Sequence, residues 1–177
     1  MKIQGQKIYL RILSGEDSLS SYIRWMNDEE VMRFTESKGR KYSIQDLKEY
    51  IRAMSDSKNK LFGIFLREND RHIGNIKIGN IHPIHKRADI GLIIGEKDLW
   101  GKGLGQEAIA LVTEHAFSVL KLKTVYAGVL SNNVGSYKAF LKAGFQKAGI
   151  FKNSFFYEGH FVDGIVVEKV NEDYKNE

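Results

Sequence analysis

A glycine-rich pentapeptide, Gly101-Lys102-Gly103-Leu104-Gly105, is the segment whose residue types point first to chemistry. It follows an apolar run and precedes a stretch with helical periodicity. Glycines in such a turn let backbone N–H groups approach a ligand, and the N-terminus of a helix favours negative charge. Lys102 can add a positive charge, although a solvated loop lysine is the alternative. The pattern predicts a site for a phosphate-bearing ligand.

Two common phosphate-binding loops do not fit this segment. In a Walker A loop the glycines would be closer together than Gly95 and Gly101, and a hydroxyl residue would stand at Gly103. Residues 103–108 match the G-x-G-x-x-A of dinucleotide-binding domains. That motif requires an acidic residue at the end of the next strand, where this chain has Leu-Ser-Asn at 130–132. Both loops are therefore excluded.

Strands and helices with clear periodicity must position this loop. Alternating or short apolar runs predict strands, and apolar residues three and four apart predict helices. Strands are expected at residues 6–13, 61–66, 72–81, 88–95, 122–130, 145–150, 155–157 and 160–170. Helices are expected in the segments that begin at residues 17, 28, 44, 104 and 134.

This order of elements predicts an α/β protein (α+β mixed), with helices on the faces of a mixed sheet. Residues 88–95 are apolar almost throughout, which is typical of a strand covered on both faces. Ser43 and Asp46 form a capping-box pattern, Asn133 can cap the helix that follows it, and Gly144 suits the left-handed position that ends that helix. We expect a single domain over residues 1–170 and a polar C-terminal tail at 171–177.

Composition narrows the function classes. The 177 residues fit one domain, and the absence of cysteine excludes disulfides, Cys-ligated zinc and thiol catalysis. The N-terminus has no apolar signal region and no apolar run reaches about 18 residues, so a cytoplasmic location is expected. The net charge of +5 is spread without a Lys/Arg run, so it indicates either an anionic small-molecule partner or an ordinary basic surface.

Six segments, spread over nearly the whole chain, carry a resemblance when they are taken in order. They are Lys-Ile-Tyr-Leu-Arg at 7–11, Ala-Asp-Ile-Gly-Leu-Ile-Ile at 88–94, the stretch 100–108, Asn-Val-Gly-Ser at 133–136, Lys-Ala-Gly-Phe at 142–145 and Phe-Val-Asp-Gly at 161–164. Together they resemble the GNAT N-acetyltransferases, and within these the RimJ/RimL-like branch. One departure is Trp100, which stands where the family usually has Arg or Gln.

The resemblance implies the GNAT fold: a central mixed, mostly antiparallel sheet of about six to seven strands, with helices on both faces. Two parallel strands, 88–95 and 122–130, would splay apart to hold the pantetheine arm of acetyl-CoA, the implied co-substrate, and no metal is implied. The pyrophosphate would bind the N–H groups of residues 101–108. The implied cofactor-binding residues are Leu92, Ile93, Ile94, Trp100, Gly101, Lys102, Gly103, Leu104, Gly105, Gln106, Asn133, Ser136 and Lys142.

Acetyl transfer to an amine benefits from a base for the amine proton and an acid for the leaving thiolate. Asp89 stands where many relatives place a carboxylate, between the apolar residues Ala88 and Ile90. It is a candidate base, acting through a water, and the alternative is an ion pair with Arg87 or Lys86. His85 is a second candidate base or acceptor contact, because similar loops lie beside the acceptor in some polyamine and amino-sugar acetyltransferases. A surface histidine is the alternative.

The family's usual acid is a tyrosine five residues before the phenylalanine of its Gly-Phe pair, and here that position is Phe140. Tyr137, three residues earlier, is a candidate substitute, with simple packing as the alternative. Ser136 and Asn133 are further candidates, and Asn133 can instead cap its helix or bind the CoA arm. The thiolate can also leave with help from solvent.

The implied activity is direct acetyl transfer in a ternary complex to a primary amine. Protein N-termini, amino sugars or nucleotide-linked amino sugars, polyamines and aminoglycoside-like amines remain open as acceptors. Phe140 motivates a different hypothesis, a non-catalytic acyl-CoA-binding module, and the +5 charge motivates a basic nucleic-acid-binding domain. We expect no nucleic acid or membrane partner, and a homodimer stays open.

Overall fold

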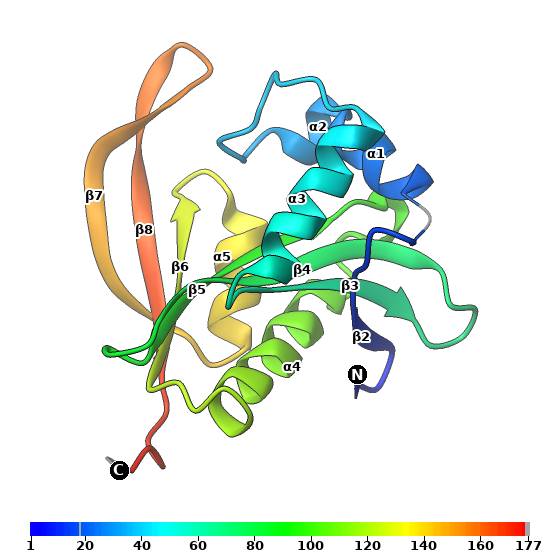
Figure 1. The fold of residues 1–177 in the computed structure, drawn as a ribbon. Coiled ribbons are helices and arrows are strands. Elements are labelled where there is room, and N and C mark those ends of the chain that lie inside the picture. The colour runs from blue at the N-terminus through cyan, green and yellow to red at the C-terminus, as the bar shows by residue number, and fades with distance from the viewer. Residues whose placement is uncertain (18, 176–177) are drawn as a thin grey trace.

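The computed structural model describes residues 1–17 and 19–175. Its centre is one sheet in which eight strands follow the order β1-β2-β3-β4-β5-β6-β8-β7 (Figure 1). Neighbouring strands are antiparallel except β5 and β6, which are parallel. The strands are β1 (Lys2–Gln4), β2 (Ile8–Ile12), β3 (Lys60–Leu66), β4 (His72–His82), β5 (Arg87–Ile94), β6 (Thr124–Leu130), β7 (Gln146–Tyr157) and β8 (His160–Val170).

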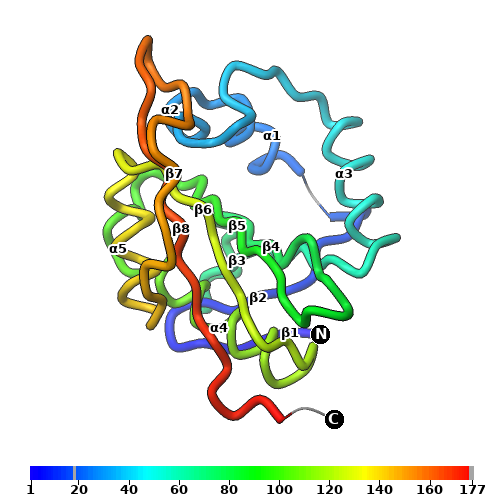
Figure 2. Tube along the Cα trace, turned by 90° about the vertical axis from the view of Figure 1, so that its left-hand side faces the viewer, coloured from blue at the N-terminus to red at the C-terminus, as the bar shows by residue number. Residues whose placement is uncertain are grey.

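Helices cover both faces of the sheet. Helices α1, α2 and α3 lie on one side and α4 and α5 on the other, as the two views show (Figures 1 and 2). The helices are α1 (Ser20–Met26), α2 (Glu29–Met32), α3 (Ile44–Asp56), α4 (Leu104–Ser118) and α5 (Val134–Lys142), with a short 3-10 helix η1 (Lys97–Leu99) before α4. No helix in the described part of the chain is long and apolar enough to cross a membrane.

Local signals in the sequence set the helix ends. The Ser43 side chain accepts a hydrogen bond from the Asp46 N–H, and the Asp46 carboxylate accepts one from the Ser43 N–H at 2.7 Å, which is the predicted capping box. Asn133 caps α5 by accepting from the Ser136 N–H at 3.2 Å. Gly144 follows α5 with φ +88°, the left-handed conformation expected of the residue that ends it.

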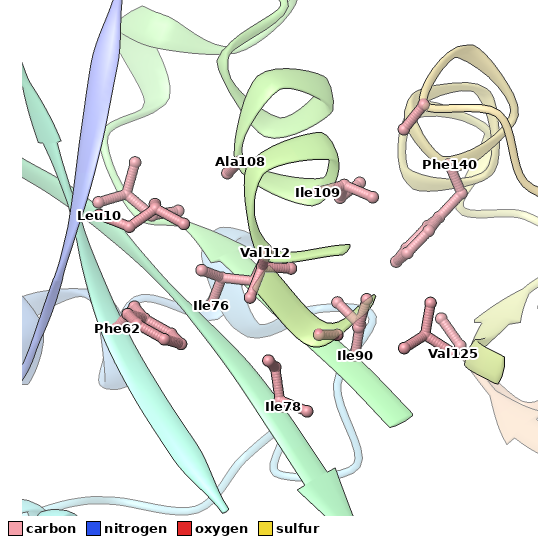
Figure 3. Close-up of a cluster of buried hydrophobic side chains, with 14 of the residues drawn as sticks. Leu10, Phe62, Ile76, Ile78, Ile90, Ala108, Ile109, Val112, Val125 and Phe140 are labelled. Atoms are coloured by element: carbon pink, nitrogen blue, oxygen red, sulfur yellow. The ribbon is translucent and has the colours of Figure 1, made fainter. Parts of the chain in front are cut away.

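Each face of the sheet has its own core. On one face, Ile76 and Ile78 of β4 pack with Ile90 of β5 against α4, where Ile109 and Val112 are fully buried (Figure 3). The other face packs against α1 and α3, with buried residues that include Tyr22, Trp25, Leu47, Ile51 and Phe65. Since side chains alternate along a strand, Asn75 and Lys77, the β4 residues that alternate with Ile76 and Ile78, face this second side.

The parallel strands β5 and β6 separate along their length. They pair at Arg87↔Thr124, Ala88↔Val125 and Asp89↔Tyr126, and the ladder ends there. Beyond that point β5 stays paired with β4 as far as Ile94, and β6 stays paired with β8 as far as Leu130. The splayed parallel pair in a mixed, mostly antiparallel sheet is therefore confirmed, and Asp89 lies at the apex of the splay.

The sheet differs from expectation at its edges. It has eight strands rather than six or seven, because Lys2–Gln4 pairs with β2 although three residues carry no readable periodicity. β7 is one strand with register shifts, where two were expected. Its interruption near Asn153 is held by Asp163 of β8, whose carboxylate accepts from the Asn153 N–H at 2.9 Å. In the tail, Asn171 donates from its N–H to the carbonyl of Lys123 at 2.8 Å.

Candidate active site

An open cleft of about 1300 Å³ runs along the splay and under α2 and α3. Its walls come from the ends of β5 and β6, the glycine loop before α4, the start of α5, and β7 and β8. Of the residues expected to do chemistry or bind a cofactor, those that line it are Asp89, Leu92, Ile93, Ile94, Trp100, Gly101, Gly103, Leu104, Gly105, Gln106, Asn133, Ser136 and Lys142. Lys102, Tyr137 and His85 are not among the lining residues.

The glycine loop presents uncapped N–H groups to one end of the cleft. Gly101 and Gly103 have φ of +76° and +83°, which side chains rarely adopt. Gly103 is the N-cap of α4 and has no side chain to accept from the first N–H groups of that helix. Glu107, the carboxylate of the first turn, turns away and accepts from the N–H of Lys7 at 3.0 Å. The helix end is thus free to bind an anion.

Trp100 fastens this loop to the end of β5. Its indole Nε1 donates to the carbonyl of Ile94 at 2.8 Å, so this carbonyl is already engaged. The guanidinium of Arg33 lies 5.7 Å from the Trp100 ring centroid and 4.7 Å from the centroid of Phe34. Trp100, which departs from the family pattern, therefore connects the end of β5, the glycine loop and the segment that follows α2.

Asp89 projects into the cleft at the apex of the splay with its side chain 19% exposed. Asn80 Nδ2 donates to its Oδ1 at 2.7 Å, and Lys77 Nζ lies 3.5 Å from its Oδ2. The expected partners Arg87 and Lys86 are replaced by Lys77, a residue of the neighbouring strand. The register explains this: Lys77 faces Gly91 on β5, and a glycine leaves room for the lysine to reach across.

Phe140 and Tyr137 take different directions from α5. Phe140 is 3% exposed, packs edge-to-face on Phe145 with centroids 5.0 Å apart, and is directed toward the core (Figure 3). Tyr137 is half-buried against the same core and does not line the cleft. Three residues turn a helix by about 300°, so the two side chains diverge by about 60°. Packing, the alternative left open for Tyr137, describes its position, and Ser136 keeps a hydroxyl-bearing side chain in the cleft lining.

His85 lies outside the cleft, in the turn between β4 and β5. The ring of His85 stacks on that of His82 with centroids 4.2 Å apart. The backbone N–H of His85 donates to His82 Nδ1 at 3.1 Å. It is exposed, as the surface alternative expected. Within residues 1–17 and 19–175, no group of three or more His, Cys, Asp or Glu could hold a metal ion.

The polar cleft residues that were not predicted from the sequence include Asn75 and Lys77 on β4 and Tyr50 on α3. Burial raises the pKa of Tyr50, the positive charge of Lys77 opposes this, and the negative charge of Asp89 adds to it. Tyr50 therefore stands close to both charged groups and stays a neutral hydroxyl at physiological pH. The sequence signal that could have identified Asn75 and Lys77 was their alternation with isoleucine along residues 75–78.

Comparisons with known proteins agree with this geometry. The family model described as "Acetyltransferase (GNAT) domain" matches residues 7–146. The protein named "Probable N-acetyltransferase YjcK" from Bacillus subtilis (strain 168) is 38% identical over 98 residues, which cover 55% of this chain and 54% of that protein. The match thus spans about half the length of this curated relative.

Two solved structures have the same fold. The spermidine N-acetyltransferase from Vibrio cholerae in complex with CoA and spermine is 22% identical, with a TM-score of 0.84 over 97% of this chain and 100% of the other. The ribosomal-protein-S5-alanine acetyltransferase from Vibrio fischeri is 18% identical, with a TM-score of 0.84 over 99% of this chain and 100% of the other. With the family match, fold and site define an acyltransferase architecture. The chain belongs to the GNAT acetyltransferase family.

Proposed function

We propose that this protein transfers the acetyl group of acetyl-CoA to a primary amine by direct attack in a ternary complex. The observation that carries the proposal is the coincidence of three features in one cleft. The β5–β6 ladder ends at Asp89, an uncapped helix N-terminus lies beyond the far end of β5, and apolar residues line the stretch between them. The pyrophosphate of acetyl-CoA would bind at the uncapped helix, its pantetheine arm would lie along the apolar stretch, and its thioester would lie near Asp89.

The residues present fit acetyl-CoA. The N–H groups that open α4 suit the pyrophosphate, and Lys142 adds a positive side chain at the same end of the cleft. Strand residues that have lost their partner across the splay can hydrogen-bond the amides of the pantetheine arm. From Asp89 to Ile94 the strand advances by about 17 Å. The arm can lie along this length with its thioester end at Asp89.

When bound, acetyl-CoA supplies an acetyl group activated as a thioester. Asp89 is placed to accept the proton that the acceptor amine loses as its nitrogen forms the new C–N bond, directly or through a water. The C–S bond breaks, and the leaving sulfur takes a proton from solvent, either directly or relayed through the Ser136 hydroxyl, which regains its own proton from water. Phe140 has no proton to give, and its ring is buried against Phe145.

An assay of thiol release from acetyl-CoA against a panel of amines tests the proposal, with CoA affinity measured in parallel by calorimetry. We expect CoA binding and amine-dependent thiol release. CoA binding without turnover of any amine would favour the acyl-CoA-binding module that Phe140 suggests, and salt-dependent binding to DNA in place of CoA would favour the nucleic-acid hypothesis. The cytoplasmic location, the single domain over residues 1–170 and the homodimer stay predictions.

A further inference from the structure

The floor of the cleft carries both signs of charge. The strand residues that line it are apolar or glycine, except for Asn75, Lys77 and Asp89. All three side chains lie on the face of the sheet that α1 to α3 cover, opposite the isoleucines that pack against α4. A floor of this composition selects the ligand by the few polar groups it offers.

Two glycines make room for the charged pair. Lys77 lies opposite Gly91 in the register, and a Cβ at Gly91 would come within 2.7 Å of Lys77 Cε. Asp89 lies opposite Gly79, where a Cβ would come within 3.0 Å of Asp89 Oδ1. The lysine stem therefore lies across β5, and its side chain stays 36% exposed. At 3.5 Å, its ammonium is close to Asp89 yet accessible from the cleft.

Asn75 adds a buried donor to the floor of the cleft, two residues before Lys77 on β4. It is 4% exposed, and its Oδ1 accepts from His72 Nε2 at 2.9 Å. The His72 ring is held between Phe65 and Trp25, with centroids 4.6 Å and 4.9 Å away. Asn75 Nδ2 has no hydrogen-bond partner among the residues that the structure describes. Since an unpaired buried donor is unfavourable, a ligand atom that accepts from it would be favoured.

Three of the four rim carboxylates contact other residues of the protein, and the fourth, Glu36, is exposed. Glu30 pairs with Lys97 at 3.0 Å, and Asp46 accepts from its own cap residue Ser43. Glu49 accepts from Gln45 Nε2 at 2.8 Å. Arg33 and Arg40 stand among them as cleft-lining cations. The argument against a polycation comes from Lys77, because its ammonium beside Asp89 would repel the further positive charges of such an acceptor.

We propose, as a refinement that rests on the acetyl transfer above, that the acceptor is an amine carrying an anionic group a short spacer away, as in an amino acid. The ammonium of the acceptor would lie at Asp89, and its anionic group would accept from Lys77 Nζ. The 3.5 Å between the protein's own charges calls for a spacer of one or two carbons.

The test compares matched acceptors in the thiol-release assay. Glycine is compared with methylamine, phosphoethanolamine with ethanolamine, and spermidine is the polycationic member. We expect kcat/KM for an anion-bearing member to exceed that of its partner by roughly tenfold or more, as charged hydrogen bonds allow. The glycine and phosphoethanolamine arms separate a carboxylate from a phosphate.

Variants of Lys77 make the test specific. Lys77→Met should remove the preference, and Lys77→Glu should shift it toward spermidine. Lys48→Glu makes the same change in net charge on the exposed side of α3, outside the cleft, and should leave the preference unchanged. CoA affinity, measured for each variant, reports whether the protein is folded.

The outcomes separate the two proposals. Turnover of methylamine or spermidine that equals or exceeds that of the anionic members, and is unmoved by Lys77→Glu, overturns the acceptor class and leaves acetyl transfer standing. Failure to bind CoA, or CoA binding with no turnover of any amine, overturns both.

Discussion

The rings of Phe34 and Tyr157 stack with centroids 5.4 Å apart and an interplanar angle of 18°, and so join the chain after α2 to the tip of the β7–β8 hairpin. Lys38 reinforces the contact, since its ammonium lies 4.7 Å from the Tyr157 ring centroid and 3.5 Å from Glu158. Figure 2 shows the hairpin tip beside α2. Because Phe34 also lines the cleft, the bridge shapes the wall that we propose faces the acceptor.

Removing the bridge should therefore weaken acceptor binding without affecting CoA. We expect Tyr157→Ala to raise KM for the amine several-fold, with CoA affinity unchanged. The matched control is Phe156→Ala, which removes a ring that is 69% exposed and packs edge-to-face on Phe161 instead of stacking on Phe34. An equal rise in KM in both variants would show that the hairpin acts through its general stability.

A charged substitution in the glycine loop should cause a selective loss of CoA binding. Gly103→Asp places a carboxylate where the uncapped N–H groups of α4 would meet the pyrophosphate, and we expect CoA affinity to fall by about 100-fold or more. Gly39→Asp is the control, because Gly39 has a similar φ of +80° and equally open surroundings away from the cleft lining. Calorimetric titration with CoA measures both, and a similar loss in the two variants would trace the effect to backbone strain.

The position of Asp89 predicts a defect in turnover rather than in CoA binding. We expect Asp89→Asn to reduce kcat by about 10² to 10⁴, as loss of a general base does, with CoA affinity near that of the unmodified protein. Asp56→Asn serves as the control, since Asp56 forms only an exposed pair with Arg52 on α3. Unchanged kcat in Asp89→Asn would remove Asp89 as the base.

His115 predicts a pH dependence of stability. It is 5% exposed, its Nε2 has no partner in the described part of the chain, and burial lowers its pKa, with the charge of Lys60 adding to the shift. The folded state therefore favours neutral His115, so the unfolded state binds more protons below its ordinary pKa of 6.5. This contribution to stability is complete above that pH and is lost as the pH falls below it.

Urea unfolding at pH 7.5 and pH 5.5 measures the effect. One such group changes the free energy of unfolding by at most about 1.4 kcal/mol per pH unit. His115→Leu should reduce the loss of stability between the two pH values, whereas His85→Leu, at an exposed position, should not. A loss that is the same in His115→Leu as in the unmodified protein would contradict the prediction.

Local patterns in the sequence determined much of the architecture. The glycine loop, the Asn133 cap, Gly144 and the alternating strands are short-range features whose physical consequences need no distant contact. Their order along the chain was enough to indicate the family and the cleft-lining residues at the end where we propose that the pyrophosphate binds. The sequence did not predict the shortest strand, β1, the 3-10 helix η1 or the continuity of β7, because none of these has a periodicity of its own.

The tertiary structure decided which side chains meet at the reacting end. The pairing of Lys77 with Asp89 depends on the register of β4 against β5 and on the space that Gly91 leaves, neither of which can be read from either strand alone. The outward position of His85 and the inward packing of Tyr137 follow from the direction of a turn and the rotation of a helix against its core. Periodicity encodes what a segment can form, whereas cross-strand neighbours are set only when segments far apart in the sequence pack together.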